Sequence, residues 1–214
     1  MLWIVLAALV FFALAFFLMP YLPGARAYRD RQTRIKTYLR QESAIKQWRA
    51  PALARQYVQK LWPNCQTPHL DMMENLLRQF FMCNLQAESA TLAIPSFALQ
   101  HFWQGVILCG KAYAEFTGQA EHIADYRPLD AREYDPQAMQ QNLLLCWQMA
   151  CLQEGLDWRQ PARLPALFGL DQKLGISNGW RYVCSNGYLQ VWRAEVREWH
   201  ILLPDRPPRL RKKD

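Results

Sequence analysis

Residues 95–116 read PSFALQHFWQGVILCGKAYAEF, and this stretch decides the fold. Pro95 and Ser96 are typical of the start of a helix, because a serine side chain can accept a hydrogen bond from the first turn. Apolar and aromatic side chains recur on one side at helical spacing, namely Leu99, Phe102, Trp103, Val106, Tyr113 and Phe116. The opposite, polar side holds Gln100, Gln104, Lys111 and Glu115. The pattern predicts one amphipathic helix over 96–117 with an aromatic-rich core face.

Helices are also predicted on the N-terminal side of this stretch. The chain has 214 residues, 51 % of them apolar and 13 % aromatic, so it can bury a sizeable core and is not a disordered protein. Pro51 begins a short helix that Pro63 ends, and one face of it carries Leu53, Tyr57 and Leu61. Asp71 is the expected N-cap of a helix over 72–84, whose buried stripe is Met73, Leu76, Leu77 and Phe80.

Two further helices are predicted on the C-terminal side. Asp135 and Pro136 are a typical cap and first residue, and Gly155 ends that helix. Its buried side chains are expected to be Met139, Leu143, Trp147 and Ala150. Pro165 begins a shorter helix that Gly175 closes.

Strand signals occur only near the end of the chain. Residues 180–184 and 188–192 are rich in aromatic and β-branched side chains and flank Asn186-Gly187, a favoured hairpin turn. The predicted fold class is therefore mostly α, with a helical domain over 51–204 that ends in a possible small C-terminal β-hairpin.

The N-terminus carries a long apolar run. Residues 2–19 are eighteen apolar residues without interruption. At about 1.5 Å per residue, roughly 20 helical residues span the ~30 Å hydrocarbon core of a bilayer. Because a backbone in lipid has to satisfy its own hydrogen bonds, the run predicts a transmembrane helix over 1–24, ended by Pro20, Pro23 and Gly24.

A basic flank follows this apolar run. Residues 25–50 hold eight basic side chains against two acidic ones and predict a charged juxtamembrane helix. Such a cluster favours a cytoplasmic location, so we expect an uncleaved single-pass anchor with the globular part in the cytoplasm. The side chains expected to contact anionic lipid are Arg26, Arg29, Arg31, Arg34 and Lys36. The alternative is a signal peptide cleaved after Ala27, since Ala25-Arg26-Ala27 has the small-x-small pattern.

The net charge of +7 comes from the two flanks of the domain. Residues 51–204 carry 12 basic and 14 acidic side chains, whereas the tail over 205–214 carries five basic and two acidic ones. Basic flanks beside a membrane segment indicate topology determinants and contacts to anionic lipids. Nucleic-acid binding through both flanks is the alternative, and it is disfavoured because such proteins usually carry the basic face on the fold itself.

Two blocks carry a resemblance to a known family. Pro95-Ser96 followed by a helix with Trp103, Ile107-Leu108, Tyr113 and Phe116 resembles the glycine-rich domain-containing protein-like family. Residues 147–176, WQMACLQEGLDWRQPARLPALFGLDQKLGI, are similar to the same bacterial group, whose members are uncharacterised. The resemblance implies a helical fold and no activity. In that family the positions of Gln100 and Gln104 are usually Asp and His, so any chemistry of that pair is expected to be absent here.

Catalytic and metal motifs are weak in this sequence. It contains no CxxC, HExxH, GxGxxG or P-loop pattern, and we expect no cofactor. His101 and His122 bracket the aromatic helix and are the candidate metal ligands if the intervening chain folds back. The six cysteines are expected to be reduced, mostly on apolar helix faces.

The predicted function follows from these features. We expect a non-catalytic interaction or scaffolding module at the inner, cytoplasmic membrane, with anionic lipids and an unidentified protein as partners and no identified small-molecule substrate. Trp192 and Trp199 are the candidate partner surface. The alternatives are a degenerate enzyme or metal-binding domain around His101 and His122, and a membrane-tethered nucleic-acid binder.

Overall fold

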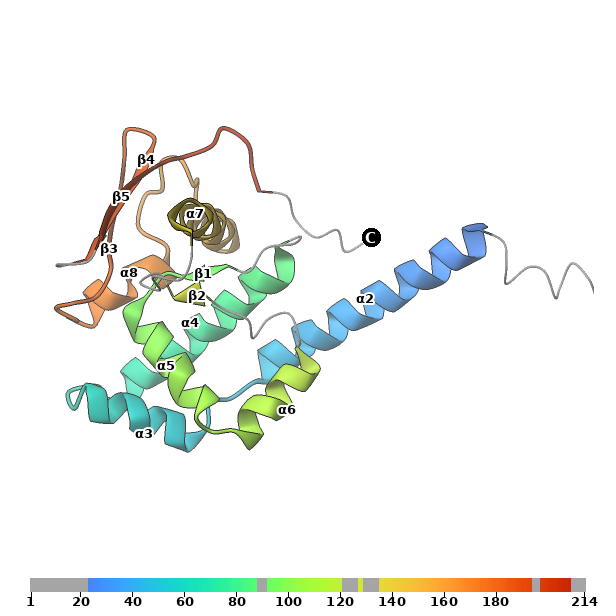
Figure 1. The fold of residues 1–214 in the computed structure, drawn as a ribbon, viewed down its shortest axis with the longest axis horizontal. Coiled ribbons are helices and arrows are strands. Elements are labelled where there is room, and N and C mark those ends of the chain that lie inside the picture. The colour runs from blue at the N-terminus through green and yellow to red at the C-terminus, as the bar shows by residue number, and fades with distance from the viewer. Residues whose placement is uncertain (1–22, 88–91, 121–126, 129–134, 194–196, 209–214) are drawn as a thin grey trace, which may run out of the picture. The chain divides into compact units, whose positions relative to one another are not determined.

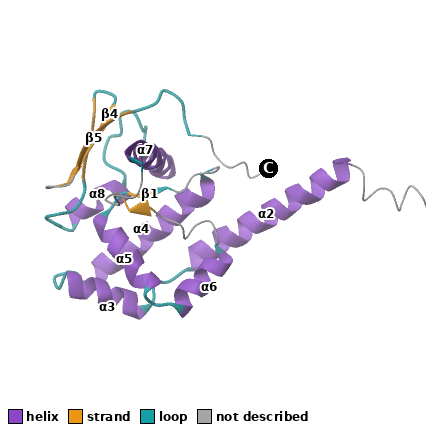
Figure 2. Ribbon diagram, viewed as in Figure 1, coloured by secondary structure: helices purple, strands orange, loops and turns teal. Residues whose placement is uncertain are grey.

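The fold is described by a computed structural model that covers residues 23–87, 92–120, 127–128, 135–193 and 197–208 (Figure 1). The chain divides into two compact units, Met1–Arg40 with Lys213–Asp214, and Gln41–Lys212. The described residues are mostly helical, and their C-terminal part holds a small three-stranded antiparallel sheet (Figure 2). The predicted mostly helical class and the C-terminal hairpin are confirmed.

The N-terminal predictions are covered only in part. The helix α2, Pro23–Gln47, matches the predicted basic helix over 25–50, although it already begins at Pro23, where proline suits a first helical turn. No helix in the described part of the chain is long and apolar enough to cross a membrane. The apolar run over 2–19 lies outside the described residues, as do residues 209–214 of the basic tail.

The helix α4, Thr67–Gln86, begins earlier than the sequence predicted. Its N-cap is Gln66, which forms a capping box with His69, so Asp71 is not the cap. Asp71 instead lies on the exposed side of α4 and forms an ion pair with Arg55, 2.8 Å away. The predicted buried stripe is confirmed at Met73, Leu76, Leu77 and Phe80.

The prediction of one long helix over 96–117 is wrong in one respect, because the structure has two separate helices there. The helix α5, Phe97–Ile107, ends before Gly110, which has a φ of +34°, and α6, Lys111–Gln119, follows. In one straight helix, Trp103 and Phe116 would be about 20 Å apart along the axis. The break brings their ring centroids to 6.1 Å, and both rings pack with Trp48 and Phe81. Burying this aromatic cluster explains the change of direction.

The helix α3, Ala52–Leu61, packs side by side with α5 (Figure 1). The predicted face is wrong at Leu53 and Leu61, which are 66 % and 42 % exposed, whereas Ala54 and Val58 are buried. Tyr57, the third residue of that face, is half-buried and lies against Gly105 of α5. The reason is a close approach at Gly105 of α5: a Cβ there would lie 3.2 Å from the Cα of Ala54. Small side chains let the two backbones approach, so the larger leucines turn outward.

The C-terminal helices have the predicted caps. In α7, Pro136–Gln153, the Asp135 carboxylate accepts from two backbone N–H groups of the first turn, and the predicted stripe Met139, Leu143, Trp147 and Ala150 is buried. The helix α8 spans Ala166–Lys173. Both helices end at a left-handed glycine, Gly155 at φ +65° and Gly175 at φ +66°, with the hydrogen bonds of a Schellman motif.

The sheet contains β3, Arg181–Ser185, β4, Tyr188–Arg193, and β5, Arg197–Leu202, in that order. Asn186 and Gly187 make the predicted tight turn with positive φ at both positions. The third strand, β5, was not predicted, and it pairs antiparallel to β4. The inner face packs toward α7 and α8 through Tyr182, Leu189, Val191, Trp199 and Ile201. Separately, β1, Ala93–Ile94, pairs in parallel with β2, Arg127–Pro128.

The contact between α3 and α5 gives a test of the fold. Gly105→Ala should lower the free energy of unfolding by about 1–3 kcal/mol, because the new methyl group meets backbone atoms of α3 that cannot give way cheaply. Gly118→Ala in α6 is the matched control, since a Cβ there meets nothing within 4 Å, and it should stabilise by about 0.5–1 kcal/mol. Urea unfolding of both variants measures the difference, and equal effects would contradict the close helix contact.

Candidate functional site

The buried carboxylate of Asp171 organises the centre of the larger unit. Asp171 is 1 % exposed and lies in α8. Its Oδ1 accepts from the Ser96 hydroxyl at 2.6 Å and from the Ala98 N–H at 3.0 Å, and its Oδ2 accepts from the N–H groups of Phe97 and Trp180, both at 2.8 Å. Three of these donors are at the N-terminus of α5, where the helix dipole favours a negative charge. The fourth, Trp180, immediately precedes β3.

Ser96 and Gly179 complete this arrangement. Ser96 donates to Asp171 and accepts from the Leu99 N–H at 3.2 Å, so it is the α5 cap that the sequence predicted. Gly179 passes so close to Asp171 that a Cβ there would lie 2.5 Å from the aspartate Cβ. The side chain of Asp171 therefore connects the start of α5 to the chain segment 176–180. A side chain at residue 179 would collide with Asp171 and prevent this connection.

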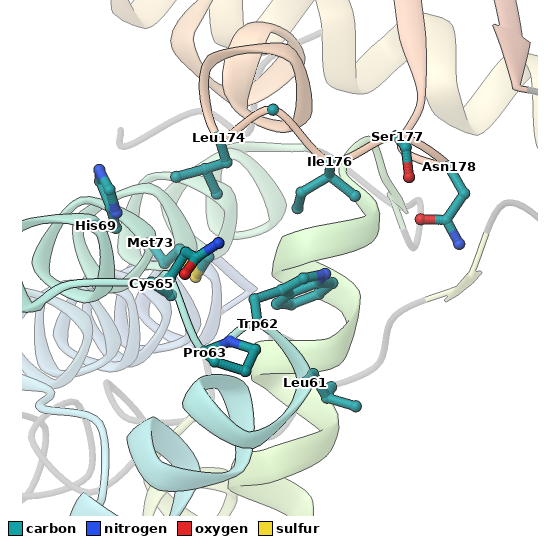
Figure 3. A pocket seen from close by; sticks show the side chains of 12 residues that line it. Leu61, Trp62, Pro63, Cys65, His69, Met73, Leu174, Ile176, Ser177 and Asn178 are labelled. Atoms are coloured by element: carbon teal, nitrogen blue, oxygen red, sulfur yellow. The ribbon is translucent and has the colours of Figure 1, made fainter.

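A pocket of about 250 Å³ opens on one side of this junction (Figure 3). One wall comes from the turn between α3 and α4 and from α4 itself, and the other comes from the end of α8 and the following turn. In Figure 3 the Trp62 ring lies below Ile176, with Ser177 and Asn178 beside it. The lining residues that matter for the chemistry below are Trp62, Cys65, His69, Met73, Ile176 and Asn178.

Both walls of the pocket are braced from α5 and the sheet. The Trp62 ring packs edge-on against Phe97 and His101 of α5, with centroid distances of 6.2 and 5.7 Å. On the other wall, the Arg193 Nε–H donates to the Asn178 carbonyl at 2.6 Å, while its guanidinium lies 4.1 Å from the Phe97 ring centroid. Because Asp171 holds Phe97 at one end and Trp180 at the other, it sets the position of both walls.

Two side chains of the pocket, His69 and Cys65, are the most relevant to its chemistry. His69 Nδ1 accepts from the Gln66 N–H at 3.2 Å, so in the neutral ring Nε2 carries the proton and can donate. Burial raises the pKa of the Cys65 thiol above its ordinary value. Cys65 is therefore protonated at neutral pH and is a poor nucleophile, although a histidine lines the same pocket.

A second buried carboxylate, Glu74 of α4, is held by a group of arginines. Its side chain is 5 % exposed and lies 2.7 Å from the Arg55 guanidinium, 3.8 Å from that of Arg78 and 3.9 Å from that of Arg49. The hydrogen bond to Glu74 raises the pKa of Arg55. Arg78 and Arg49 also donate to the Trp48 carbonyl, at 3.1 and 3.0 Å. The cluster links the end of α2 to α3 and α4, and its carboxylate is fully occupied by these structural contacts.

The sequence of the larger unit matches a described family. The family model named UCP032817-like matches residues 40–198. The chain belongs to the UCP032817-like family. That family is uncharacterised, and the match does not bear on the resemblance to the glycine-rich domain-containing protein-like family, which stays a prediction. Searches of curated proteins and of solved structures found no match. The matched range of this UCP032817-like protein contains Asp171 and every residue that lines the pocket.

Only one of the two predicted metal ligands of the UCP032817-like chain lies among the described residues. His101 lies on α5, with its ring 4.4 Å from the Phe97 centroid, and His122 lies outside the described residues. No group of three or more His, Cys, Asp or Glu side chains in the described ranges could hold a metal ion. Gln100, expected on a polar helix face, is buried at 7 % exposure, and Gln104 one turn later is half-buried.

The two tryptophans predicted as a partner surface lie on opposite faces of the sheet. Trp192 is 37 % exposed, on the face turned away from the helices, together with Val183, Tyr188 and Leu202. Trp199 is buried on the inner face and stacks on Trp180 at 6.1 Å, so it does not belong to an exposed surface. Successive side chains of a strand point to opposite faces of the sheet. Trp199 pairs with Val191, which faces inward, whereas Trp192 is the residue after Val191 and therefore faces outward.

The basic side chains predicted to contact lipid lie on α2. Arg29, Arg31, Arg34 and Lys36 are exposed there, whereas the side chain of Arg26 lies outside the described ones. The six cysteines are free thiols, and four of them are buried. Sequence reasoning missed Asp171, because an aspartate within a helix gives no local sign that it caps another helix 75 positions away.

Replacing Asp171 tests its role in this UCP032817-like protein. Asp171→Asn should lower the free energy of unfolding by about 2–3 kcal/mol, because the amide nitrogen cannot accept from the buried N–H groups that the carboxylate serves. Asp135→Asn is the matched control, since it caps α7 in an exposed position where Asn is equally good, and should change stability by a few tenths of a kcal/mol. Thermal unfolding compares the two, and an equally small effect at Asp171 would contradict its central role.

Alkaline pH offers a second test through the buried thiol of Cys151. Burial raises the pKa of Cys151 to about 12 from 9.0. Above pH 9 the unfolded thiol ionises while the folded one stays protonated, so stability falls as pH rises toward 12, by up to about 1 kcal/mol per pH unit. Urea unfolding between pH 8 and 11 should therefore show a shallower decline for Cys151→Ala than for the unmodified chain. Cys109→Ala, at a partly exposed site, is the control, and identical slopes for the Cys151 variant and the unmodified chain would refute the assignment.

Proposed function

We propose that the protein is a non-catalytic binding module that residues 1–24 tether to the cytoplasmic face of the inner membrane. The observation that carries the proposal is the charge and exposure of α2 directly after the apolar run. Lys and Arg side chains crowd residues 26–40 of α2, and those at Arg29, Arg31, Arg34 and Lys36 are exposed. Basic side chains next to a membrane segment favour the cytoplasmic side, where anionic lipids attract them.

Residues 28–40 of α2 also carry a basic strip beside an apolar one, while Arg31 and Arg34 lie on the side opposite the basic strip. Arg29, Lys36 and Arg40 follow one another at spacings of seven and four residues, and therefore share a strip of the helix within about 40°. Tyr28 and Leu39 lie on a different strip and are 63 % and 55 % exposed. A basic strip beside an apolar one suits the boundary between headgroups and acyl chains. Each basic residue near an anionic surface contributes about 1 kcal/mol.

The larger unit has features of a binding module. Its residues 51–204 are nearly neutral, so the basic flanks are separate from the fold. The protonated thiol of Cys65 disfavours cysteine-based nucleophilic catalysis in the pocket. The outer face of the sheet presents Val183, Tyr188, Trp192 and Leu202, which are 37–63 % exposed. Exposed apolar groups of this kind are common at protein interfaces, so this face is our candidate for contact with the unidentified protein partner.

Charge substitution on α2 tests the tether and its orientation. The unmodified chain, expressed in bacterial cells, should remain in the membrane fraction, with its larger unit protected from protease added outside. Arg31→Gln, Arg34→Gln and Lys36→Gln together should place a measurable share of the chains in the opposite orientation, because they remove part of the positive charge that holds the flank inside. Protease protection of a C-terminal tag in spheroplasts and in inverted vesicles measures that share.

The control removes the same number of charges elsewhere. Lys60, Lys111 and Lys173 are exposed on α3, α6 and α8, and their replacement by Gln should leave the orientation unchanged. Recovery of a shortened soluble product outside the cytoplasm, cut after Ala27, would refute the tether. An orientation equally insensitive to both triple variants would refute the role of the basic helix.

A further inference from the structure

We propose that the pocket between the α3–α4 turn and the end of α8 binds a neutral, ring-containing small molecule that carries a hydrogen-bond acceptor. The proposal rests on the size, the lining and the bracing of the pocket, and it does not depend on the membrane tether.

The size of the pocket limits the ligand to a single small ring system. Its volume of about 250 Å³ lies just below the ~300–1,000 Å³ of typical ligand pockets. A dinucleotide or another extended cofactor does not fit that space. A substituted six-membered ring does.

The walls of the pocket favour a flat apolar body. Trp62 supplies an aromatic surface, and Met73 supplies a thioether that adapts to rings of different shape. The remaining apolar lining comes from Leu61, Pro63, Leu174 and Ile176. In Figure 3 Ile176 faces the Trp62 ring across the opening, so a ring between them would contact apolar atoms on both sides.

The polar groups of the pocket favour a neutral ligand with an acceptor. Its lining contains no Lys, Arg, Asp or Glu, and its polar side chains are those of Asn64, His69, Ser177 and Asn178. A charged ligand would lose hydration without gaining an opposite charge, which is costly. The side chains of Asn64, Ser177 and Asn178 can each donate a hydrogen bond to an acceptor on the ligand. The Nδ1 of His69 is engaged by the Gln66 N–H, so in the neutral ring only its Nε2–H can donate.

The pocket is held open before any ligand binds. Phe97 and His101 support the Trp62 ring, as described above. On the opposite wall, Arg181 donates to the Ile176 carbonyl at 2.8 Å and Arg193 donates to that of Asn178 at 2.6 Å. A site whose walls are already fixed loses little conformational entropy on binding, which favours affinity for a small ligand.

Fluorine NMR with three isosteric probes tests the proposal on the full chain in detergent micelles. The probes are 4-fluorobenzamide, which is neutral, 4-fluorobenzoate, which is negative, and 4-fluorobenzamidine, which is positive. We expect 4-fluorobenzamide to show saturable line broadening with a dissociation constant at least tenfold lower than those of the two charged probes. Micelles without protein correct for partitioning of each probe.

Three variants locate the bound probe. Trp62→Ala should weaken binding of 4-fluorobenzamide at least tenfold, because it removes the aromatic wall. Trp192→Ala removes a partly exposed tryptophan from the outer sheet face, and should leave binding unchanged. Asn178→Ala changes an exposed rim side chain and keeps the carbonyl that Arg193 holds, so it should fold normally and weaken binding about threefold.

Each contrary result would overturn the proposal. Absence of saturable broadening by 4-fluorobenzamide up to 10 mM would exclude the ligand class, as would equal affinity for the charged probes. Unchanged binding in both the Asn178 variant and a folded Trp62 variant would place the probe elsewhere. Loss of binding in the Trp192 variant would place it on the sheet. None of these results bears on the membrane tether, which protease protection tests separately.

Discussion

The Asp171 carboxylate is the constraint on which the rest of the larger unit depends. A buried negative charge is tolerated only when donors surround it, and here one hydroxyl and three backbone N–H groups do so. These donors belong to two segments, the start of α5 and the residue before β3. The hydrogen bonds of this one carboxylate therefore join the helical layer to the sheet. They also help to hold the two walls of the pocket, which carry Trp62 and Asn178, in position.

A second acidic side chain works in the same way nearby. Glu154, at the end of α7, accepts from the Ala166 N–H at 2.7 Å and so caps α8, the helix that carries Asp171. It also pairs with Arg163 and accepts from Gln79 of α4 at 3.2 Å. Two carboxylates thus position the N-termini of α5 and α8 through space. Aromatic packing of Trp147, Phe168 and Tyr182 then links α7, α8 and β3, with ring centroids about 5 Å apart.

The distribution of charge separates two tasks along the chain. Basic side chains are concentrated in α2 and the tail, whereas the pocket lining is uncharged and the domain between them is nearly neutral. Attraction to an anionic surface requires a concentration of positive charge. Selection of a neutral ligand requires a pocket without net charge, since a strong field in the pocket would favour charged ligands. The proposed membrane contact and the proposed ligand site therefore occupy different parts of this UCP032817-like chain.

The sequence by itself determined those features whose cause lies within a few residues. Asp135 as a cap, Gly155 and Gly175 as helix ends, and the Asn186-Gly187 turn follow from local hydrogen bonds and backbone angles. The buried stripes of α4 and α7 follow from helical spacing. Of the candidate site, only the Ser96 cap was predicted, and the pocket was not.

Only the tertiary structure decided the features that depend on distant partners. The break at Gly110 allows an aromatic cluster to be buried, and the buried face of α3 is set by its close contact with Gly105. Asp171 accepts hydrogen bonds at the start of a helix 75 positions earlier in the chain. Local spacing cannot reveal these roles, because packing and burial act between neighbours in space, and the sequence does not state which residues become neighbours.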